Sequence, residues 1–385
     1  MHRRLIFFAV LLALPVVVLA AIEGALRLAG LGGYPPTFVE PGRLDDGSRL
    51  VFTDARGPGS YFFASRSQGL ALDPVPLVDP KPAGTVRIVW VGGSAAKGIP
   101  QERPLRASAF LEEMLADLWP GRDVEVINIG VPGIASYPVL GVMTEALDYD
   151  PDLVVAYLGN NEFYGAYGVA SLHAAGRSPA MIRLTRAVRS TAIAQGFDRL
   201  LRGKNTVPAR DLMEAMVADA SIAPDSPMRD AAAATLEAFV GDMIDRCHAR
   251  DVPIIVCPPP CNESGMAPLG VADLSALDAP SRSAVESALA RAHDRRPAAE
   301  SEAARCARTG PRPRHRPPPA RAGPAGLQDR NEEAASEFRL AVDLDPMPWR
   351  PPTSSIEAIR RAALAPCSRR PRRGVPGTGL VGSPR

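Results

Sequence analysis

The stretch VRIVWVGGSAAKGIP, residues 86–100, decides the fold of this chain. Its first part, residues 86–91, is a short apolar run rich in β-branched side chains, which is typical of a buried strand. The next residues are Gly92, Gly93 and Ser94, and glycine lets a backbone turn sharply without a Cβ clash. The stretch therefore predicts a strand that ends in a tight turn and presents a serine hydroxyl beyond its end.

Outward from this stretch, apolar strands alternate with amphipathic helices. Further strands are predicted at 124–129, 153–158 and 252–257, and helices at 107–119, 137–147, 179–220 and 231–250. Such alternation is typical of βαβ units, in which helices cover both faces of a parallel sheet. Ligands of these sheets bind beyond the carboxyl ends of the strands. Chemistry is therefore expected just after each strand.

Three of these strand ends carry residues suited to acyl chemistry. Ser94 follows the first strand, and its own N–H can face a developing oxyanion. Gly133 follows the second strand and can expose another backbone N–H at the same edge. Asn161 follows the third strand and can offer a side-chain amide. Each motif alone is usually a turn or a cap. Their occurrence at successive strand ends predicts one site.

These blocks resemble those of the SGNH/GDSL hydrolases. Gly93-Ser94 resembles the serine block, 128–133 the glycine block and 159–161 the G-x-N block, with Glu162 where the family usually has Asp. VGGSAAKGIP, VINIGVPG and YLGNNEFYG are similar to a bacterial membrane-anchored subgroup with tetratricopeptide helices after the hydrolase domain. The resemblance covers roughly residues 80–270. It implies a flavodoxin-like three-layer α/β/α sandwich, and ester hydrolysis or acyl transfer through a serine acyl-enzyme.

The chain departs from the family at the general base, an Asp-x-x-His near the end of the domain. The only such spacing here joins Asp245 to His248, at the end of a predicted helix and so at the amino edge of the sheet, opposite Ser94. His173 follows the Asn161 loop on the correct side, but a lone loop histidine is more often structural. A serine without a base is a weak nucleophile. We therefore expect poor hydrolysis of simple esters.

The N-terminus predicts a membrane anchor. His2, Arg3 and Arg4 precede an uncharged apolar run from residue 5 to 22. That length fits a short membrane-spanning helix or a long signal-peptide core. We favour the uncleaved anchor, with cleavage near Ala20 as the alternative. The basic start is expected to stay cytoplasmic, which places the domain in the periplasm or on the cell surface.

The remaining boundaries follow from composition. We expect an anchor at 1–31, a spacer and lead-in at 32–84, the hydrolase-like domain at 85–275, partial tetratricopeptide-like helices at 276–365 and a disordered tail at 366–385. The helical region is interrupted from about 295 to 324 by Arg- and Pro-rich sequence that cannot form a core. A repeat-like helix then resumes mid-motif near Glu333. This favours out-of-frame segments over a natural basic tail.

Composition narrows the function further. A net charge of +2 gives no nucleic-acid signal. Five irregularly spaced cysteines form no disulfide framework, and we expect no cofactor and no metal. The leading hypothesis is an extracytoplasmic serine ester hydrolase that acts on an ester or an acylated carbohydrate. The alternatives are a membrane-anchored interaction protein whose helical repeats bind a protein partner, and an acyltransferase acting on an envelope polysaccharide.

Overall fold

The structure is a computed structural model. It describes residues 2–62, 73–171, 176–202, 221–263 and 338–365, with a few isolated residues between 266 and 336. The chain divides into two compact units, one made of Met1–Asn262 with Pro348–Arg385 and the other of Glu263–Met347. The first unit contains the sheet predicted from the sequence.

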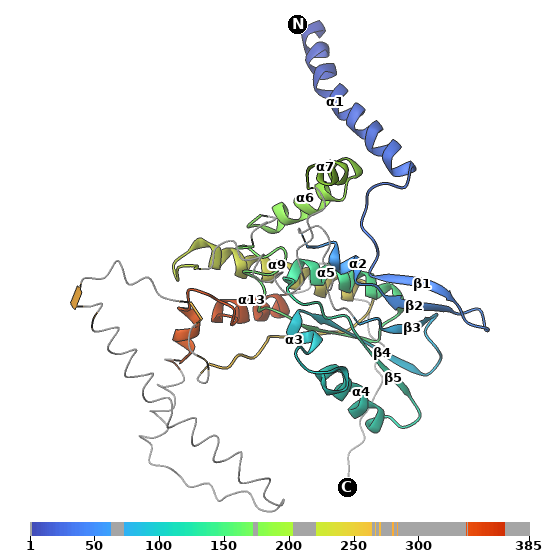
Figure 1. Ribbon diagram of the computed structural model, residues 1–385, viewed down its shortest axis with the longest axis vertical. Helices are drawn as coiled ribbons and strands as arrows, with labels where there is room; N and C mark the ends of the chain where they lie inside the picture. Colours follow the sequence, from blue (N-terminus) through green and yellow to red (C-terminus); the bar gives the residue numbers. More distant parts are fainter. Residues whose placement is uncertain are drawn as a thin grey trace, which may run out of the picture. The chain divides into compact units, whose positions relative to one another are not determined.

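A four-stranded parallel sheet forms the centre of the first unit (Figure 1). Its strands are β4 (Thr85–Gly92), β5 (Asp123–Asn128), β6 (Leu153–Tyr157) and β7 (Ile254–Cys257), in the order β5-β4-β6-β7. The four predicted strands are confirmed, with ends within two residues of the prediction. Because β4 lies between β5 and β6, the strand order reverses beside it, as in flavodoxin-like folds. That reversal is where such folds bind ligands.

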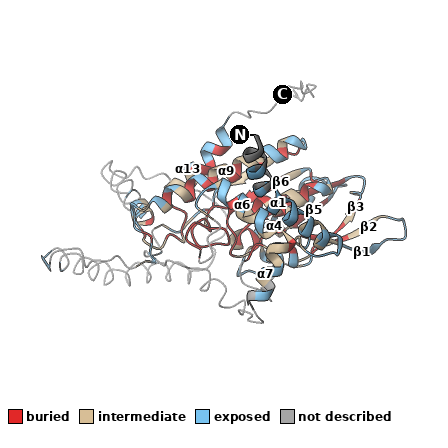
Figure 2. Cartoon of the chain, turned by 90° about the horizontal axis from the view of Figure 1, so that it is seen from above, coloured by how far each residue is buried: buried red, intermediate tan, exposed pale blue. Residues whose placement is uncertain are grey.

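Helices cover both faces of this sheet (Figure 1). One face carries α5 (Ser136–Ala146) and α9 (Pro227–Ala249), and α13 (Thr353–Leu364) packs on α9. The other face carries α4 (Ala107–Leu118), against β5. The larger core, buried in Figure 2, lies between the sheet and α5 with α9. The predicted three-layer α/β/α architecture is therefore confirmed.

The α4 layer is the thinner of the two. Leu115 packs against Ile88 and Val126 of the sheet. Phe110 and Met114 of the same helix are exposed, at 54% and 62%. The apolar side of α4 is thus wider than the sheet face that it covers.

The helical stretch predicted from 179 to 220 is helical in its described part, but it is divided there by a short break. It forms two helices, α6 (Pro179–Arg189) and α7 (Ala192–Arg202), and residues 203–220 lie outside the described residues. The break has a local cause, because Thr191 Oγ1 accepts a hydrogen bond from Ala194 N at 3.2 Å. A side-chain oxygen in that position starts a new helix.

The lead-in before the sheet is more ordered than the sequence suggested. It contains a three-stranded antiparallel sheet of β1 (Phe38–Arg43), β2 (Arg49–Thr53) and β3 (Pro76–Asp79), after which β4 begins. Thr37 donates through N and Oγ1 to the Glu145 carboxylate at 2.6 and 2.9 Å. The segment therefore packs against α5 beside the main sheet. These short strands escaped prediction because none has a sustained apolar period.

The remaining elements lie at the two ends of the chain. α1 (His2–Leu28) is a single helix. Within the part of the chain that is described, no helix has both the length and the hydropathy needed to cross a membrane. The helix predicted at 353–365 is confirmed as α13, which lies in the first unit.

The second unit is described only in part. Its Asp345 carboxylate accepts hydrogen bonds from the backbone of Leu269, Gly270 and Met347, at 2.8 to 2.9 Å. Residues 338–343 are helical. The Arg- and Pro-rich segment, the first half of the repeat-like helix and the tail from 366 onward lie outside the described residues.

Candidate active site

Ser94 begins the short helix α3 (Ser94–Lys97), directly after β4. The turn before it requires glycine, because Gly92 has a φ of +149° and a Cβ there would lie 1.9 Å from Tyr157 O. Lys97 N donates to Gly93 O at 3.0 Å and closes the turn. Ser94 itself is only half-buried, so a substrate can reach it.

Asn161 lies against the residue that precedes the serine. A methyl group added to Gly93 would come within 2.5 Å of Asn161 Nδ2. Asn161 is only 5% exposed, and its Nδ2 is buried without a hydrogen-bond partner among the described residues. An unpaired buried donor costs about 1–3 kcal/mol. The unpaired amide therefore needs an explanation. A bound ligand whose oxygen accepts a hydrogen bond from Asn161 Nδ2 would provide it.

Gly133 reaches the same place from the end of β5. Its φ is +70°, and its carbonyl accepts a hydrogen bond from Ala166 N at 2.7 Å, which ties it to the loop after β6. Ile134 O lies 3.8 Å from the position of a Cβ on Gly93. Among the described residues, neither Ser94 N–H nor Gly133 N–H has an acceptor. The structure thus brings the three sequence-predicted residues to one edge of the sheet.

Glu162 holds two of these loops together. It is 3% exposed, and Ser136 donates to it through N at 3.0 Å and through Oγ at 2.7 Å. Burial raises the pKa of Glu162 to about 7, although the hydrogen bonds from Ser136 oppose the shift. Because Ser136 begins α5, this contact fixes the Gly133 loop relative to Asn161. The sequence showed Glu162 only as a departure from the family's Asp.

Lys97 is a residue near the site that sequence reasoning missed. It comes one helical turn after Ser94, its side chain is 4% exposed, and its Nζ is without a hydrogen bond. The Asp73 carboxylate lies nearby, with its Oδ2 3.9 Å from Nζ. Burial lowers the pKa of Lys97, against the attraction of Asp73. The i, i+3 spacing from the serine was the available signal.

No histidine with a described side chain lies at this edge. His248 is in the last turn of α9, just before β7, and so at the amino edge as the sequence indicated. His173, His293 and His315 lie outside the described residues. Within the described chain, no three His, Cys, Asp or Glu side chains gather as a metal site would need.

Known proteins offer few matches. No family model matches the chain, and no curated protein matches it. Among solved structures, an aspartate-to-alanine variant of the esterase AlinE4 aligns at 18% identity over 44% of this chain and 75% of its own, with a TM-score of 0.23. TesA aligns at 19% identity over 44% and 76%, also with a TM-score of 0.23. AlinE4, an SGNH-hydrolase family esterase, aligns at 17% identity over 66% and 96%, with a TM-score of 0.21. TM-scores this low leave the chemistry to be argued from the residues of the site.

Proposed function

We propose that this chain is a serine ester hydrolase of the SGNH type, with Ser94 as its nucleophile. The observation that supports the proposal is the buried, unpartnered amide of Asn161 beside Gly93. Together with the free N–H groups of Ser94 and Gly133, this amide forms a set of donors suited to an oxyanion. Such a set stabilises the tetrahedral intermediate of acyl transfer.

The chemistry follows from this arrangement. Ser94 Oγ attacks the ester carbonyl, and its proton passes through solvent to the leaving alkoxide, while the three donors stabilise the negative charge on the carbonyl oxygen. The alcohol leaves, and water then hydrolyses the acyl-serine. Oxyanion donors contribute about 10²–10³-fold each, and a general base about 10²–10⁴-fold. With no histidine described beside Ser94, we expect slow turnover.

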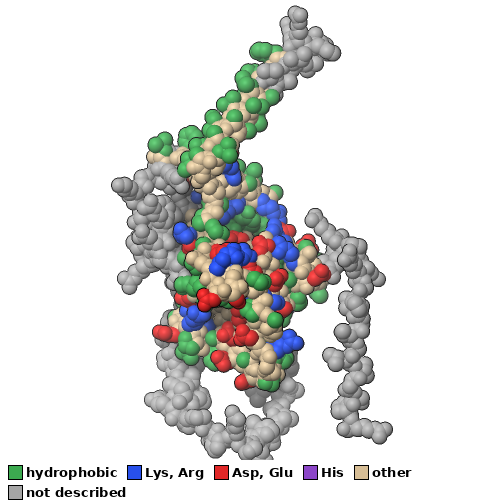
Figure 3. All heavy atoms as spheres, turned by 90° about the vertical axis from the view of Figure 1, so that its right-hand side faces the viewer, with side chains coloured by type: hydrophobic (Ala, Val, Ile, Leu, Met, Phe, Trp, Pro, Cys, Tyr) green, Lys and Arg blue, Asp and Glu red, His purple; other side chains and the backbone are tan. Residues whose placement is uncertain are grey.

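The proposal includes attachment to a membrane through α1. The described side chains of α1 between Phe7 and Ala20 are apolar and exposed, and Figure 3 shows hydrophobic side chains along this helix. The basic residues before the apolar run favour an extracytoplasmic domain. An ester or an acylated carbohydrate of the cell envelope is then the substrate class within reach.

The test measures aryl-ester hydrolysis by the whole chain in detergent, with and without imidazole as an added base. We expect slow turnover that imidazole accelerates in the wild type but not in Ser94→Ala, which also subtracts the reaction of imidazole itself. Turnover that is the same in Ser94→Ala would rule out Ser94 as the nucleophile. Full activity without imidazole would mean that a base is present, and His173→Ala and Lys97→Met would then identify it.

A second candidate function is a membrane-anchored interaction protein in which the hydrolase fold is only a scaffold. The absence of a histidine among the described residues at the carboxyl edge favours it. It predicts no Ser94-dependent turnover, with or without imidazole. The same assay therefore separates the two functions.

A further inference from the structure

Hydrogen bonds connect the end of α1 to the start of α7. The Glu23 carboxylate accepts hydrogen bonds from Ala192 N at 2.9 Å and Ile193 N at 3.1 Å. It therefore caps the N-terminus of α7 with a negative charge. Gln195 Nε2 donates to Gly33 O at 2.7 Å from the other side. Through these bonds, α7 follows the position of the end of α1.

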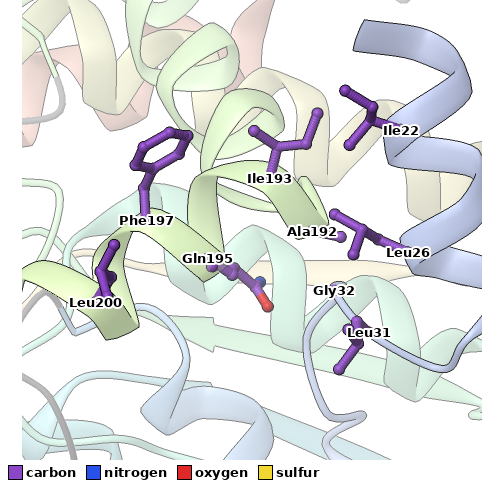
Figure 4. A pocket seen from close by; sticks show the side chains of 10 residues that line it. Ile22, Leu26, Leu31, Gly32, Ala192, Ile193, Gln195, Phe197 and Leu200 are labelled. Carbon is purple, nitrogen blue, oxygen red and sulfur yellow. The ribbon is translucent and has the colours of Figure 1, made fainter. Parts of the chain in front are cut away.

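The α7 face is defined here by Ile193, Phe197 and Leu200, which recur at helical spacing. Phe197 is 62% exposed and Leu200 is 80% exposed. Figure 4 shows how these side chains and those of Ile22 and Leu26 on α1 border an open apolar pocket of about 300 Å³. Apolar side chains gathered in this way mark an interaction surface.

The apolar surface of the neighbouring helix α1 indicates that a lipid bilayer covers the α7 face. Val16, Val17, Val18 and Leu19 are 48–66% exposed, so α1 is apolar around its whole circumference here. An apolar helix without a polar side suits a bilayer better than water. The first charge after Arg4 is Glu23, which accepts the hydrogen bonds from α7. A bilayer that holds the apolar run would therefore end at the level of α7.

The charge of the segment 177–202, called the surface arm here, also favours a lipid bilayer as the partner of the α7 face. The segment 177–202 contains one acidic residue, Asp198, and six arginines, namely Arg177, Arg183, Arg186, Arg189, Arg199 and Arg202. Arg183 pairs with Asp242, and Arg186 donates to Ser60. The other arginines of the segment still outnumber its one acidic residue, and this excess of positive charge complements anionic lipid headgroups. Apolar residues on one face and basic residues along the same segment are typical of helices that lie in a membrane surface.

We propose that the α7 face is a second membrane contact, which lies in the bilayer surface and inserts Phe197 and Leu200 among the upper acyl chains. The proposal rests on the anchoring of α1 in the proposed function, but not on ester hydrolysis. A helix and a surface arm joined at Glu23 hold the hydrolase domain in one orientation on the membrane. Attachment through α1 alone would let the domain rotate on the membrane.

The test uses tryptophan fluorescence of the full chain in vesicles of phosphatidylcholine and phosphatidylglycerol that carry bromine at either a shallow or a deep acyl position. Phe197→Trp reports on α7 and Leu14→Trp on α1. Phe110→Trp is the matched control, because it is a 54% exposed Phe on α4. Each variant is compared with the wild type, whose three tryptophans give the background.

We expect shallow bromines to quench most of the emission that Phe197→Trp adds, deep bromines to quench Leu14→Trp, and neither to quench Phe110→Trp. Omitting phosphatidylglycerol should weaken only the quenching of Phe197→Trp. Quenching of Leu14→Trp without that of Phe197→Trp overturns the α7 contact and leaves the anchor intact. If neither Phe197→Trp nor Leu14→Trp is quenched, both the α7 contact and the α1 anchor are overturned. An unquenched, blue-shifted Phe197→Trp that depends on protein concentration would show that a second copy covers the face.

Discussion

The two edges of the parallel sheet treat buried polar groups in opposite ways. At the amino edge, Arg87 is fully buried, and its guanidinium donates to Tyr149 O at 2.7 Å, to Val78 O at 2.8 Å and to the Glu125 carboxylate. At the carboxyl edge, Asn161 Nδ2 is equally hidden from water but has no partner. The first edge satisfies this buried cation within the chain, whereas the second leaves the Asn161 amide unpaired among the described residues.

The amino edge also joins the two sheets of the first unit. Val78 belongs to β3 of the lead-in, whereas Glu125 belongs to β5 of the main sheet, and Arg87 on β4 binds both. The Asp152 carboxylate accepts Arg87 N at 2.7 Å and Lys81 Nζ at 2.8 Å. Stability is thus concentrated where no chemistry is expected. Free polar groups are kept where the strand order reverses.

The largest effect is expected from Arg87→Met. It removes one member of a buried ion pair and leaves the Val78 and Tyr149 carbonyls without their donor, which costs about 3–5 kcal/mol. Denaturant unfolding of the whole chain in detergent measures the loss. Arg122→Met, at an exposed turn residue, is the control and should stay within about 0.5 kcal/mol. A loss below about 1 kcal/mol for Arg87→Met would mean that the edges do not differ as described.

The next effect concerns pH and Glu162. Burial raises its folded pKa to about 7, above the ordinary glutamate value of 4.5. The folded chain therefore keeps a proton that the unfolded chain loses. The contribution of this proton is complete below pH 4.5 and is lost as pH rises toward 7, by about 3 kcal/mol at most.

Glu162→Gln should therefore flatten the fall in melting temperature between pH 5 and pH 8. The Ser136 hydroxyl can turn to accept from the new amide, so the contact survives. Melting curves of both proteins across this range give the comparison. Parallel curves would show that Glu162 titrates normally, and the buried contact with Ser136 would then need another account.

The sequence predicted the main sheet well, because its strands are buried on both faces and read as continuous apolar runs. It failed for β1 to β3, where Pro, Gly and exposed residues interrupt any period. It predicted the helical stretch that begins at 179 but did not show the break at Thr191, where a side-chain cap separates α6 from α7. Local hydrogen bonds of this kind depend on the backbone geometry, which cannot be read from the residue composition of a segment.

The candidate site was predictable in position but not in its supports. Ser94, Gly133 and Asn161 follow from the rule that chemistry gathers at carboxyl strand ends. The Ser136–Glu162 contact joins residues 26 positions apart, and no period in the sequence relates them. The buried state of Lys97 likewise depends on how the lead-in folds around Asp73. Such contacts appear only when the tertiary structure is known.

A smaller effect is expected from Gly93→Ala. The added methyl would lie 2.5 Å from Asn161 Nδ2, and one of the two must move, at a cost of about 1–3 kcal/mol. Gly241→Ala is the matched control, since a methyl there meets nothing within 4 Å and the residue lies inside α9. It should stabilise the chain by about 0.5–1 kcal/mol. If both substitutions have the same sign, Asn161 does not pack against the serine turn.

The smallest change in stability is expected from Asn161→Ala, and it tests the comparison most directly. Truncation removes a donor that has no partner, so the relief of an unsatisfied group offsets the lost packing, and the net change should stay within about 1 kcal/mol. Asn128→Ala is the matched control from the same edge. Asn128 donates to Ser108 Oγ at 2.8 Å and to Ala96 O at 3.1 Å, and it accepts Gly130 N at 2.9 Å.

Because Asn128 is fully paired, its truncation strands those partners and should cost about 1–3 kcal/mol. Imidazole-assisted ester hydrolysis should show the reverse order, with Asn161→Ala losing about 10²–10³-fold and Asn128→Ala, measured below its unfolding transition, losing far less. Denaturant unfolding and initial rates on the same preparations decide the matter. If Asn161→Ala is the more destabilising variant and leaves the rate unchanged, the Asn161 amide has an ordinary structural role. It is then not an oxyanion donor.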